Sequence, residues 1–421
     1  MPRRPATVFI LAAILLDILG IGLIIPVLPR LVGELAGSRD AQTWWYGALV
    51  ISYGAMQFLC APALGALSDR VGRRPVLLAG IGGLAVMFLV PALTSSLWVL
   101  LASRIVGGMF AANLAVAQAY IADVTPPDKR AAAFGKLGAV FGLGFMLGPA
   151  LGGVLAEASL RLPFFVAAAL AAVNFLYGLL VLPESVPHER RGRFEPARAN
   201  PFSSLAALAR LRGVGALVTV IALMGLAQFL LHTTWPLYTE FRYGWTPLAI
   251  GVSLFLVGVV MVLVQGVALP RLLRRLGEVR LVLAGLASAM LAYLGYGLAT
   301  AGWVALVIIC FNLLAGAVGP TLQGIVSRSV DAQEQGRAMG ALASLGSLMA
   351  VIAPLIGTPL LAQVSHLPPQ DWRVGGVLLL AAALQALALG LAAWHFRHHP
   401  LRPAAVAGSR NPQDDSRRLK D

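Results

Sequence analysis

Long apolar runs, each bounded by charged or Pro/Gly-rich segments, restrict the fold of this 421-residue chain more than any other feature. Runs of about 18 residues or more predict membrane-spanning helices. Apolar residues make up 58% of the chain and charged residues 12%, against roughly 45–50% and about 25% in soluble domains. These values exclude a soluble enzyme, a disordered protein and a secreted disulfide scaffold. We expect an all-α membrane protein with twelve transmembrane helices, at residues 6–28, 43–66, 75–94, 97–121, 134–157, 162–182, 214–236, 247–270, 279–299, 302–326, 337–362 and 373–396.

The formal net charge of +14 would suggest a nucleic-acid partner in a soluble protein. Here 26 of the 32 basic residues fall on one side of the predicted membrane and five on the other. Cytoplasmic loops carry the excess of Lys and Arg, so this distribution places both termini in the cytoplasm. The charge therefore reports topology, and we expect no nucleic-acid partner. The first apolar run is too long for a signal peptide core and is expected to be retained as a span.

A repeat with an offset of 205 residues relates the two halves of the chain, and it implies a pseudo-twofold axis along the membrane normal. The matched pairs are Gly72 and Gly277, Gln118 and Gln323, Gly135 and Gly340, Pro149 and Pro354, and Gly152 and Gly357. We expect an N-terminal six-helix bundle at 1–182, a central cytoplasmic linker at 183–213 and a C-terminal six-helix bundle at 214–396. The basic cytoplasmic tail at 397–421 is expected to be disordered.

Asp17 is the only carboxylate in the middle of a predicted span, and Arg104 is the only intramembrane base. An ionisable residue at that depth is costly and indicates a function. Their similar depth, about 16 Å and roughly 20 Å from the cytoplasm, predicts a pair. In the functional interpretation Asp17 takes up a proton as substrate leaves and Arg104 favours its charged form. In the alternative the two residues form a permanent ion pair that locks the first span to the fourth.

The first cytoplasmic turn contains a second motif, in which glycines allow a tight backbone approach and Asp69 is expected to cap a helix N-terminus. Arg73 is expected to pair with Asp123 at the end of the fourth span. The alternative interpretation, topogenic charge alone, does not explain the glycine spacing. The predicted residues of this gate motif are Gly65, Asp69, Arg70, Gly72, Arg73 and Asp123.

The fifth span carries small residues at spacings that let helices pack closely, together with a proline expected to kink the helix. These residues are Gly144, Gly148, Pro149, Gly152 and Gly153. A packing seam without a role in transport is the alternative interpretation.

Together these motifs resemble those of the major facilitator superfamily, in its drug:proton antiporter family with twelve spans. The likeness is closest to the tetracycline-resistance-like branch and covers nearly the whole chain except the tail. The resemblance implies that Asp69, Arg73 and Asp123 form a charge relay at the inner gate. It also implies that the 144–153 motif belongs to a proton-coupled antiporter driven by the proton gradient, without a cofactor.

The sequence departs from tetracycline exporters at three positions. The resemblance places an acid in helix 3, a histidine in helix 8 and an acid in helix 9, and the matching residues here are Met87, Met261 and Ala289. None of them can titrate, which argues against tetracycline itself as the substrate. Proton coupling then falls on Asp17, with Glu157 and Glu240 as weaker candidates.

Polar residues on shared helical faces are candidates for contacts with a substrate, since helices 1, 4, 7 and 10 line the cavity in carriers that this chain resembles. Asn113 is expected on the opposite face from Arg104. Interhelical hydrogen bonding is the alternative role for any one of the candidates. The predicted cavity residues are Tyr53, Gln57, Gln118, Gln228, His232, Trp235, Asn312 and Gln323.

These features predict a proton-coupled exporter of amphipathic, drug-like compounds in a bacterial plasma (inner) membrane, and not an enzyme. The expected partners are the lipid bilayer, protons and a small amphipathic substrate, with the chain as a monomer and without a metal site. The first alternative is an uptake symporter for a sugar or another metabolite. The second is a non-transporting membrane sensor or assembly partner.

Overall fold

The computed structural model describes residues 7–126, 129–186, 215–329 and 335–399, and these residues form helices and connecting turns without a strand. Most of the predicted central linker and the predicted tail from residue 400 onward lie outside the described residues. Ten helices are individually long and apolar enough to cross a membrane, and the bent pair α13 and α14 adds another crossing.

One of these helical runs, Pro247–Leu298, has 52 residues. At 1.5 Å per residue it would extend about 78 Å, which is more than twice the thickness of a bilayer core. Gly277 divides it, because its φ of 74° and ψ of 165° are not helical. The run therefore makes two crossings, and the described chain makes twelve, as the sequence predicts.

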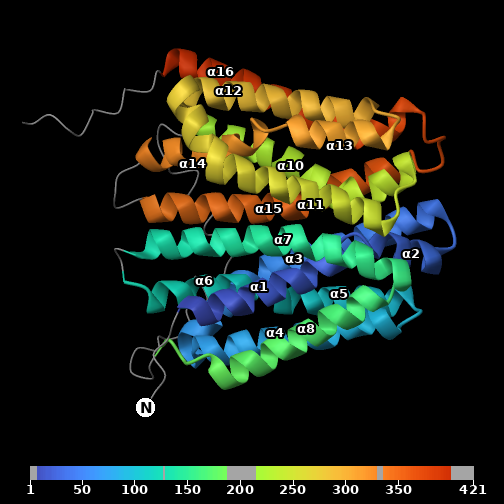
Figure 1. Ribbon diagram of the computed structural model, residues 1–421, viewed down its shortest axis with the longest axis vertical. Coiled ribbons are helices and arrows are strands. Elements are labelled where there is room, and N and C mark those ends of the chain that lie inside the picture. The colour runs from blue at the N-terminus through green and yellow to red at the C-terminus, as the bar shows by residue number, and fades with distance from the viewer. Residues whose placement is uncertain (1–6, 127–128, 187–214, 330–334, 400–421) are drawn as a thin grey trace, which may run out of the picture.

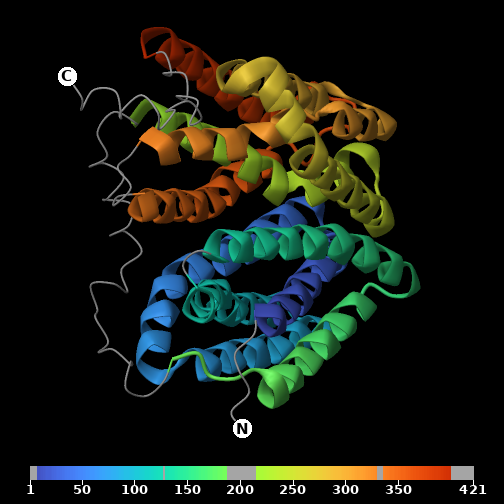
Figure 2. The same ribbon diagram turned by 60° about the vertical axis from the view of Figure 1, so that its left-hand side comes forward.

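The first six crossings pack against one another as one group of helices, drawn in blue to green in Figures 1 and 2. We name this group the first bundle. Its helices are α1 (Thr7–Ile24), α2 (Leu28–Ala36), α3 (Arg39–Val71), α4 (Arg73–Leu93), α5 (Leu97–Ala111), α6 (Asn113–Val124), α7 (Arg130–Ala158) and α8 (Leu162–Val181).

The remaining crossings form the second bundle, drawn in yellow-green to red above the first in Figure 2. A short π-helix, Val264–Ala268, joins the second and third of its α-helices on the approach to the Gly277 turn, and a 3-10 turn, Trp372–Gly375, precedes the last. The helices of the second bundle are α10 (Gly215–Tyr243), α11 (Pro247–Leu263), α12 (Leu269–Leu298), α13 (Gly302–Phe311), α14 (Ala315–Ser329), α15 (Gln335–Ala362) and α16 (Gly376–His398).

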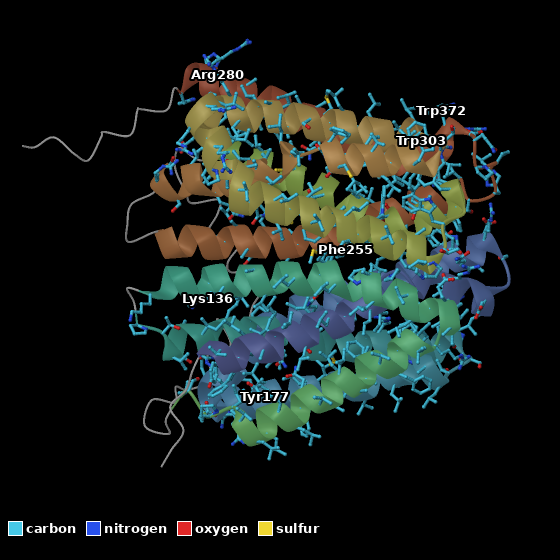
Figure 3. All side chains as sticks on the ribbon, viewed as in Figure 1. Lys136, Tyr177, Phe255, Arg280, Trp303 and Trp372 are labelled. Carbon is cyan, nitrogen blue, oxygen red and sulfur yellow. The ribbon has the colours of Figure 1, made fainter. Side chains whose placement is uncertain are left out.

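The connections between crossings lie at two opposite ends of the molecule. The Gly37 end carries residues 37–38, 94–96, 159–161, 244–246, 299–301 and 363–371, and the Gly72 end carries residues 72, 125–126, 129, 182–186 and 277. In Figure 3, Trp303 and Trp372 lie toward the Gly37 end, whereas Lys136 and Arg280 lie toward the Gly72 end. Exposed tryptophans are typical of a membrane interface and clustered basic residues of a cytoplasmic face.

Gly72 and Gly277, which the 205-residue repeat pairs, adopt similar backbone conformations. Both have positive φ, 113° and 74°, with ψ of 152° and 165°. Only glycine adopts this region readily. At both positions a helix ends and the next one begins within a single residue, so each glycine makes an abrupt turn at the same end of its bundle.

Three crossings that the sequence predicts as continuous are broken. The first is interrupted at residues 25–27, the fourth at Ala112 and the tenth at residues 312–314. The last two breaks lie next to Asn113 and Asn312, each of which lines a cavity. Apolar periodicity continues through these breaks, and for that reason it did not reveal them.

Candidate functional site

A cavity of about 220 Å³ lies inside the first bundle, and Asp17 on α1 is the only carboxylate among the described residues of its lining. Apolar side chains form most of the wall, and Tyr53, Gln57 and Asn113 supply its other polar groups. The buried Oδ1 atom of Asp17 has no hydrogen-bond partner. This arrangement leaves a carboxylate oxygen available to a proton inside a largely apolar chamber. We name this chamber the Asp17 cavity.

Arg104 on α5 does not reach Asp17. No ion pair within 4 Å joins these two described side chains, and the Nε and Nη2 atoms of Arg104 have no hydrogen-bond partner. The guanidinium carbon lies 5.6 Å from the ring centroid of Tyr53, which itself lines the Asp17 cavity. The predicted direct pair is therefore wrong for this conformation, in which Tyr53 of α3 lies against Arg104 and shares the cavity wall with Asp17.

A second cavity, of about 390 Å³, lies inside the second bundle. Among its described lining residues there is no aspartate, glutamate, lysine or arginine. Of the residues predicted to contact substrate, this lining includes Gln228, His232, Trp235 and Asn312, so the structure brings these four together. Its wall is apolar and aromatic with a few amide groups, as is typical of sites for small amphipathic ligands. We name it the Gln228 cavity.

The other predicted cavity residues divide into two pairs. Tyr53 and Gln57 line the Asp17 cavity. Gln118 and Gln323 are exposed on α6 and α14 and line neither cavity. Asn113, expected on the opposite face, does line the Asp17 cavity, where its Nδ2 donates to the Leu77 carbonyl at 2.9 Å. Arg104 is not in the lining of that cavity, which agrees with the expectation that Asn113 lies on another face.

Four polar residues that line the second cavity were missed from the sequence: Gln265, Tyr293, Tyr296 and Gln385. Tyr293 on α12 and Gln385 on α16 both line the Gln228 cavity and are buried. The hydroxyl of Tyr293 donates to Oε1 of Gln228 at 3.4 Å. A glutamine in the middle of the strongly apolar last span was the available signal, since an amide there needs a partner or a ligand.

The two cavities adjoin at one aromatic contact. Phe145 on α7 lines the Asp17 cavity, and His232 on α10 lines the Gln228 cavity. Their ring centroids are 6.1 Å apart. The walls of the two cavities therefore meet at these two rings.

The glycines of the fifth-span motif lie on α7 and permit its close packing against two helices. A Cβ on Gly148 would lie 2.8 Å from the Cα of Gly22 on α1, and one on Gly153 would lie 2.7 Å from the Pro247 carbonyl oxygen at the start of α11. Gly144 packs against Ile18 of α1 in the same way. The motif therefore joins the first bundle internally and also holds it against the second bundle.

Gly152 and Pro149 complete this motif. A Cβ on Gly152 would collide with the Leu23 backbone of α1, and the Pro149 carbonyl lies directly against Gly251 of α11. Gly142, nearer the Gly72 end of the same helix, has no heavy atom within 4 Å of its virtual Cβ. The tight packing of α7 is thus confined to the motif and the Gly37 end.

The gate motif at the Gly72 end forms around the buried guanidinium of Arg73. Its Nη2 lies 2.5 Å from Asp69 Oδ1, and its Nε lies 3.1 Å from Asp123 Oδ2. Its Nη1 donates to Ser68 Oγ at 2.5 Å and to the Gly65 carbonyl at 3.4 Å. The predicted contact between Arg73 and Asp123 is confirmed, and it ties the start of α4 to the end of α6.

The prediction that Asp69 caps a helix is wrong. Glu184, which follows α8, accepts hydrogen bonds from the backbone N–H of Arg73 at 2.9 Å and of Arg74 at 3.3 Å. A carboxylate at the N-terminus of α4 is favoured by the unpaired N–H groups there. Asp69 lies one turn away on α3 and is engaged with the Arg73 side chain instead, while Arg70 is exposed at the end of α3.

At the Gly37 end, polar contacts join the two bundles. Nε2 of Gln42 lies 3.4 Å from both carboxylate oxygens of Glu240, and the hydroxyl of Tyr46 donates to the Thr233 carbonyl at 3.0 Å. The hydroxyl of Ser365 donates to Asp40. The structure is therefore closed at the Gly37 end. Glu157 is exposed at the same end, away from both cavities.

Comparison with known proteins agrees with this architecture. Residues 10–354 match the family model of the Major Facilitator Superfamily. The tetracycline resistance protein, class C, of Escherichia coli is 42% identical over 397 residues, which cover 94% of this chain and 98% of that protein. Multidrug resistance protein 2 of Bacillus subtilis is 28% identical over 375 residues, which cover 87% of this chain and 91% of that protein.

Solved structures share the fold. The human organic anion transporter MFSD10 (TETRAN) aligns with a TM-score of 0.66 and 28% identity, over 92% of this chain and 98% of that chain. A bacterial homologue of the human lysosomal transporter Spinster, in an inward-facing and unoccupied conformation, aligns with a TM-score of 0.71 over 94% of this chain and 98% of that chain. At 15% identity the latter similarity concerns the fold alone.

Proposed function

This chain belongs to the major facilitator superfamily, and on that premise we propose that it is a proton-coupled exporter of amphipathic, drug-like compounds. As a member it is a multi-pass membrane carrier and not an enzyme. It works by antiport and alternating access, as a monomer in a bacterial inner membrane with both termini in the cytoplasm. The proton gradient is its energy source, and no cofactor takes part.

The observation that carries this proposal is the division of polar groups between the two cavities. Asp17 provides a protonatable carboxylate in one cavity, and the adjoining Gln228 cavity has an apolar, aromatic wall without fixed charge among its described residues. An unpaired carboxylate in an apolar chamber favours its neutral form, and access to water favours ionisation. Exposure to each side of the membrane in turn would therefore load and release a proton. Arg104 acts on this exchange through Tyr53.

The gate contacts support alternating access. The pairs across the Gly37 end hold it closed in this state, and the Arg73 cluster lies at the opposite end, within the first bundle. In the opposite state the contacts at the Gly37 end must separate, and the Arg73 cluster would meet the second bundle. The glycine motif of α7 provides a surface on which the bundles can rotate while they stay in contact.

Tetracycline is not the expected substrate, although the relatives described above include a tetracycline resistance protein. Met261 and Ala289 both line the Gln228 cavity, where the resemblance leads us to expect a histidine and an acid. Met87 lies on α4 near Gly107. None of the three carries a charge that could bind a polar, metal-chelating molecule, so the cavity favours compounds with large apolar surfaces.

The test is transport in liposomes that contain the full chain and an internal pH probe. A panel of amphipathic compounds is added, and proton movement is compared for the wild type, Asp17→Asn and the exposed-carboxylate control Glu34→Gln. We expect Asp17→Asn to abolish compound-driven proton movement and Glu34→Gln to retain it. Full coupling in Asp17→Asn would refute the role of Asp17, and proton movement with a sugar alone would favour an uptake symporter. Movement of no compound at all would favour a sensor.

A further inference from the structure

Gln385 on α16 has an unusual environment for an amide. Its side chain is 1% exposed and lines the Gln228 cavity, and its Oε1 atom has no hydrogen-bond partner. A buried amide oxygen without a partner is destabilising, and native proteins rarely retain one without a ligand or water to complete it. The position therefore calls for a hydrogen-bond donor from inside the cavity.

The Tyr293 hydroxyl lies beside the Gln385 amide, but the hydrogen bonds of the neighbouring polar groups leave Gln385 Oε1 without a partner. The Tyr293 hydroxyl donates to Oε1 of Gln228, so that Nε2 of Gln228 is left to donate to Nε2 of His232, at 3.0 Å. An amide nitrogen only donates, so His232 accepts at Nε2 and carries its proton on Nδ1. Oδ1 of Asn312 accepts from Ser288 at 2.8 Å. Gln385 Oε1 thus remains the unused acceptor of this wall.

The lining also defines the charge of an occupant. No aspartate, glutamate, lysine or arginine is among the described residues of this cavity, and its one histidine, His232, accepts a hydrogen bond from Gln228. A charged molecule would lose its hydration there without gaining a counter-ion, which is strongly unfavourable. Trp235 and Tyr296, whose ring centroids are 5.1 Å apart, provide aromatic surfaces fixed by packing. Trp235 is further held by its Nε1–H, which donates to Ser253 Oγ at 3.0 Å.

We propose that the Gln228 cavity selects an uncharged aromatic compound that carries an O–H or N–H group, and that Gln385 is the residue that selects it by accepting this hydrogen bond. This inference rests on the proposed export function, since it names the class of compound that the same carrier takes. It also separates two roles: the proton binds at Asp17, and the substrate binds in a neutral cavity of the other bundle.

Binding of a matched pair of compounds tests the assignment. The full chain in lipid nanodiscs is titrated with radiolabelled 2-naphthol and with its methyl ether, which lacks only the O–H donor. We expect the wild type to bind the naphthol up to about tenfold more tightly, as one neutral hydrogen bond allows. Gln385→Leu should bind both compounds equally. The control Gln363→Leu removes an exposed amide at the Gly37 end and should keep the wild-type preference.

A third compound tests the charge. A naphthyl trimethylammonium ion should bind the wild type more weakly than the naphthol, and Gln385→Glu should shift the preference toward the cation. The inference is overturned if the wild type binds the methyl ether as well as the naphthol, if Gln385→Leu retains the preference, or if the cation binds best. Retained binding of the methyl ether shows that a variant is folded. If Gln385→Leu does not fold, Gln385→Met replaces it. The relative binding of the three compounds to the wild type tests the inference in either case.

Failure of this inference and failure of the proposed function are distinguishable. The binding assay uses no gradient, so it reports selectivity whether or not protons move. Naphthol-selective binding without proton movement would contradict the export mechanism and support the role of Gln385 in selectivity. Proton-coupled transport of cations in preference to neutral aromatic compounds would support the export mechanism and contradict the proposed selectivity.

Discussion

Phe145 on α7 and His232 on α10 face each other across the boundary between the two bundles, with their ring centroids 6.1 Å apart. Each ring belongs to a different cavity. The contact therefore separates the proposed proton site at Asp17 from the proposed substrate site and also connects them. A carrier needs such a link, because occupancy of one site must alter the other for coupling to occur.

Phe145→Ala should merge the two cavities and loosen coupling. Loss of the ring removes the partition, so water and protons would reach Asp17 without bound substrate. We expect a several-fold increase in proton leak through liposomes in the absence of substrate, measured with an internal pH dye. Phe165→Ala, at an exposed ring on α8, is the control and should leave the leak unchanged. An unchanged leak in Phe145→Ala would show that the ring is not the partition.

Gly152→Ala should destabilise the protein, because its added methyl group would meet the Leu23 backbone of α1 and not a flexible side chain. We expect a loss of about 1–3 kcal/mol in the free energy of unfolding, as in other overpacked sites. Gly142→Ala on the same helix meets open space and should be neutral or stabilising. Thermal unfolding of both variants in detergent measures the difference. Equal unfolding temperatures for the two variants would contradict the close packing of Gly152 against α1.

Arg73→Lys should weaken the cluster at the Gly72 end. Lysine keeps the charge but cannot bind Asp69, Asp123 and Ser68 at once in the planar geometry of a guanidinium. We expect a loss of about 1–3 kcal/mol in stability, the range for hydrogen bonds to charged groups, and slower transport. Urea unfolding and initial transport rates measure these effects. The exposed neighbour Arg70, substituted by lysine, should retain the wild-type stability, since its side chain does not lie within the cluster.

Removal of the contacts at the Gly37 end should favour opening there. In a double variant, Gln42→Leu with Ser365→Ala, the links to Glu240 and Asp40 are lost. We expect longer distances between spin labels placed on α2 and on the 363–371 loop, measured by double electron–electron resonance. A distance distribution identical to that of the wild type would show that these two links do not keep this end closed.

Export of a neutral compound in exchange for one proton should be electrogenic. Asp17 is the only carboxylate among the described residues that line its cavity, so one cycle carries one positive charge inward. A potential of about 100 mV contributes about 2.3 kcal/mol per charge, which supports a substrate gradient of about 50-fold without a pH gradient. The measurement is substrate accumulation in liposomes in which valinomycin and a potassium gradient set the membrane potential. Transport driven only by a pH gradient would indicate an electroneutral cycle.

The apolar runs, the charge asymmetry and the single intramembrane acid determined much of this protein from its sequence. Twelve crossings, the contact between Arg73 and Asp123 and membership of the family follow from features that are local in the chain. Local patterns suffice for these because a bilayer demands apolar helices of fixed length, whatever their neighbours.

The tertiary structure decided which side chains meet. It placed Tyr53 against Arg104 and in one cavity wall with Asp17, and gave the capping role to Glu184 instead of Asp69. It also placed Asn113 in the lining of the Asp17 cavity, and it buried Gln385 with an unpaired oxygen. These outcomes depend on helix rotation and on breaks in helices, and a few tens of degrees change which face meets a neighbour. Hydropathy is nearly the same on all faces of such helices, so the sequence specifies that they span the membrane, and only their packing specifies the site.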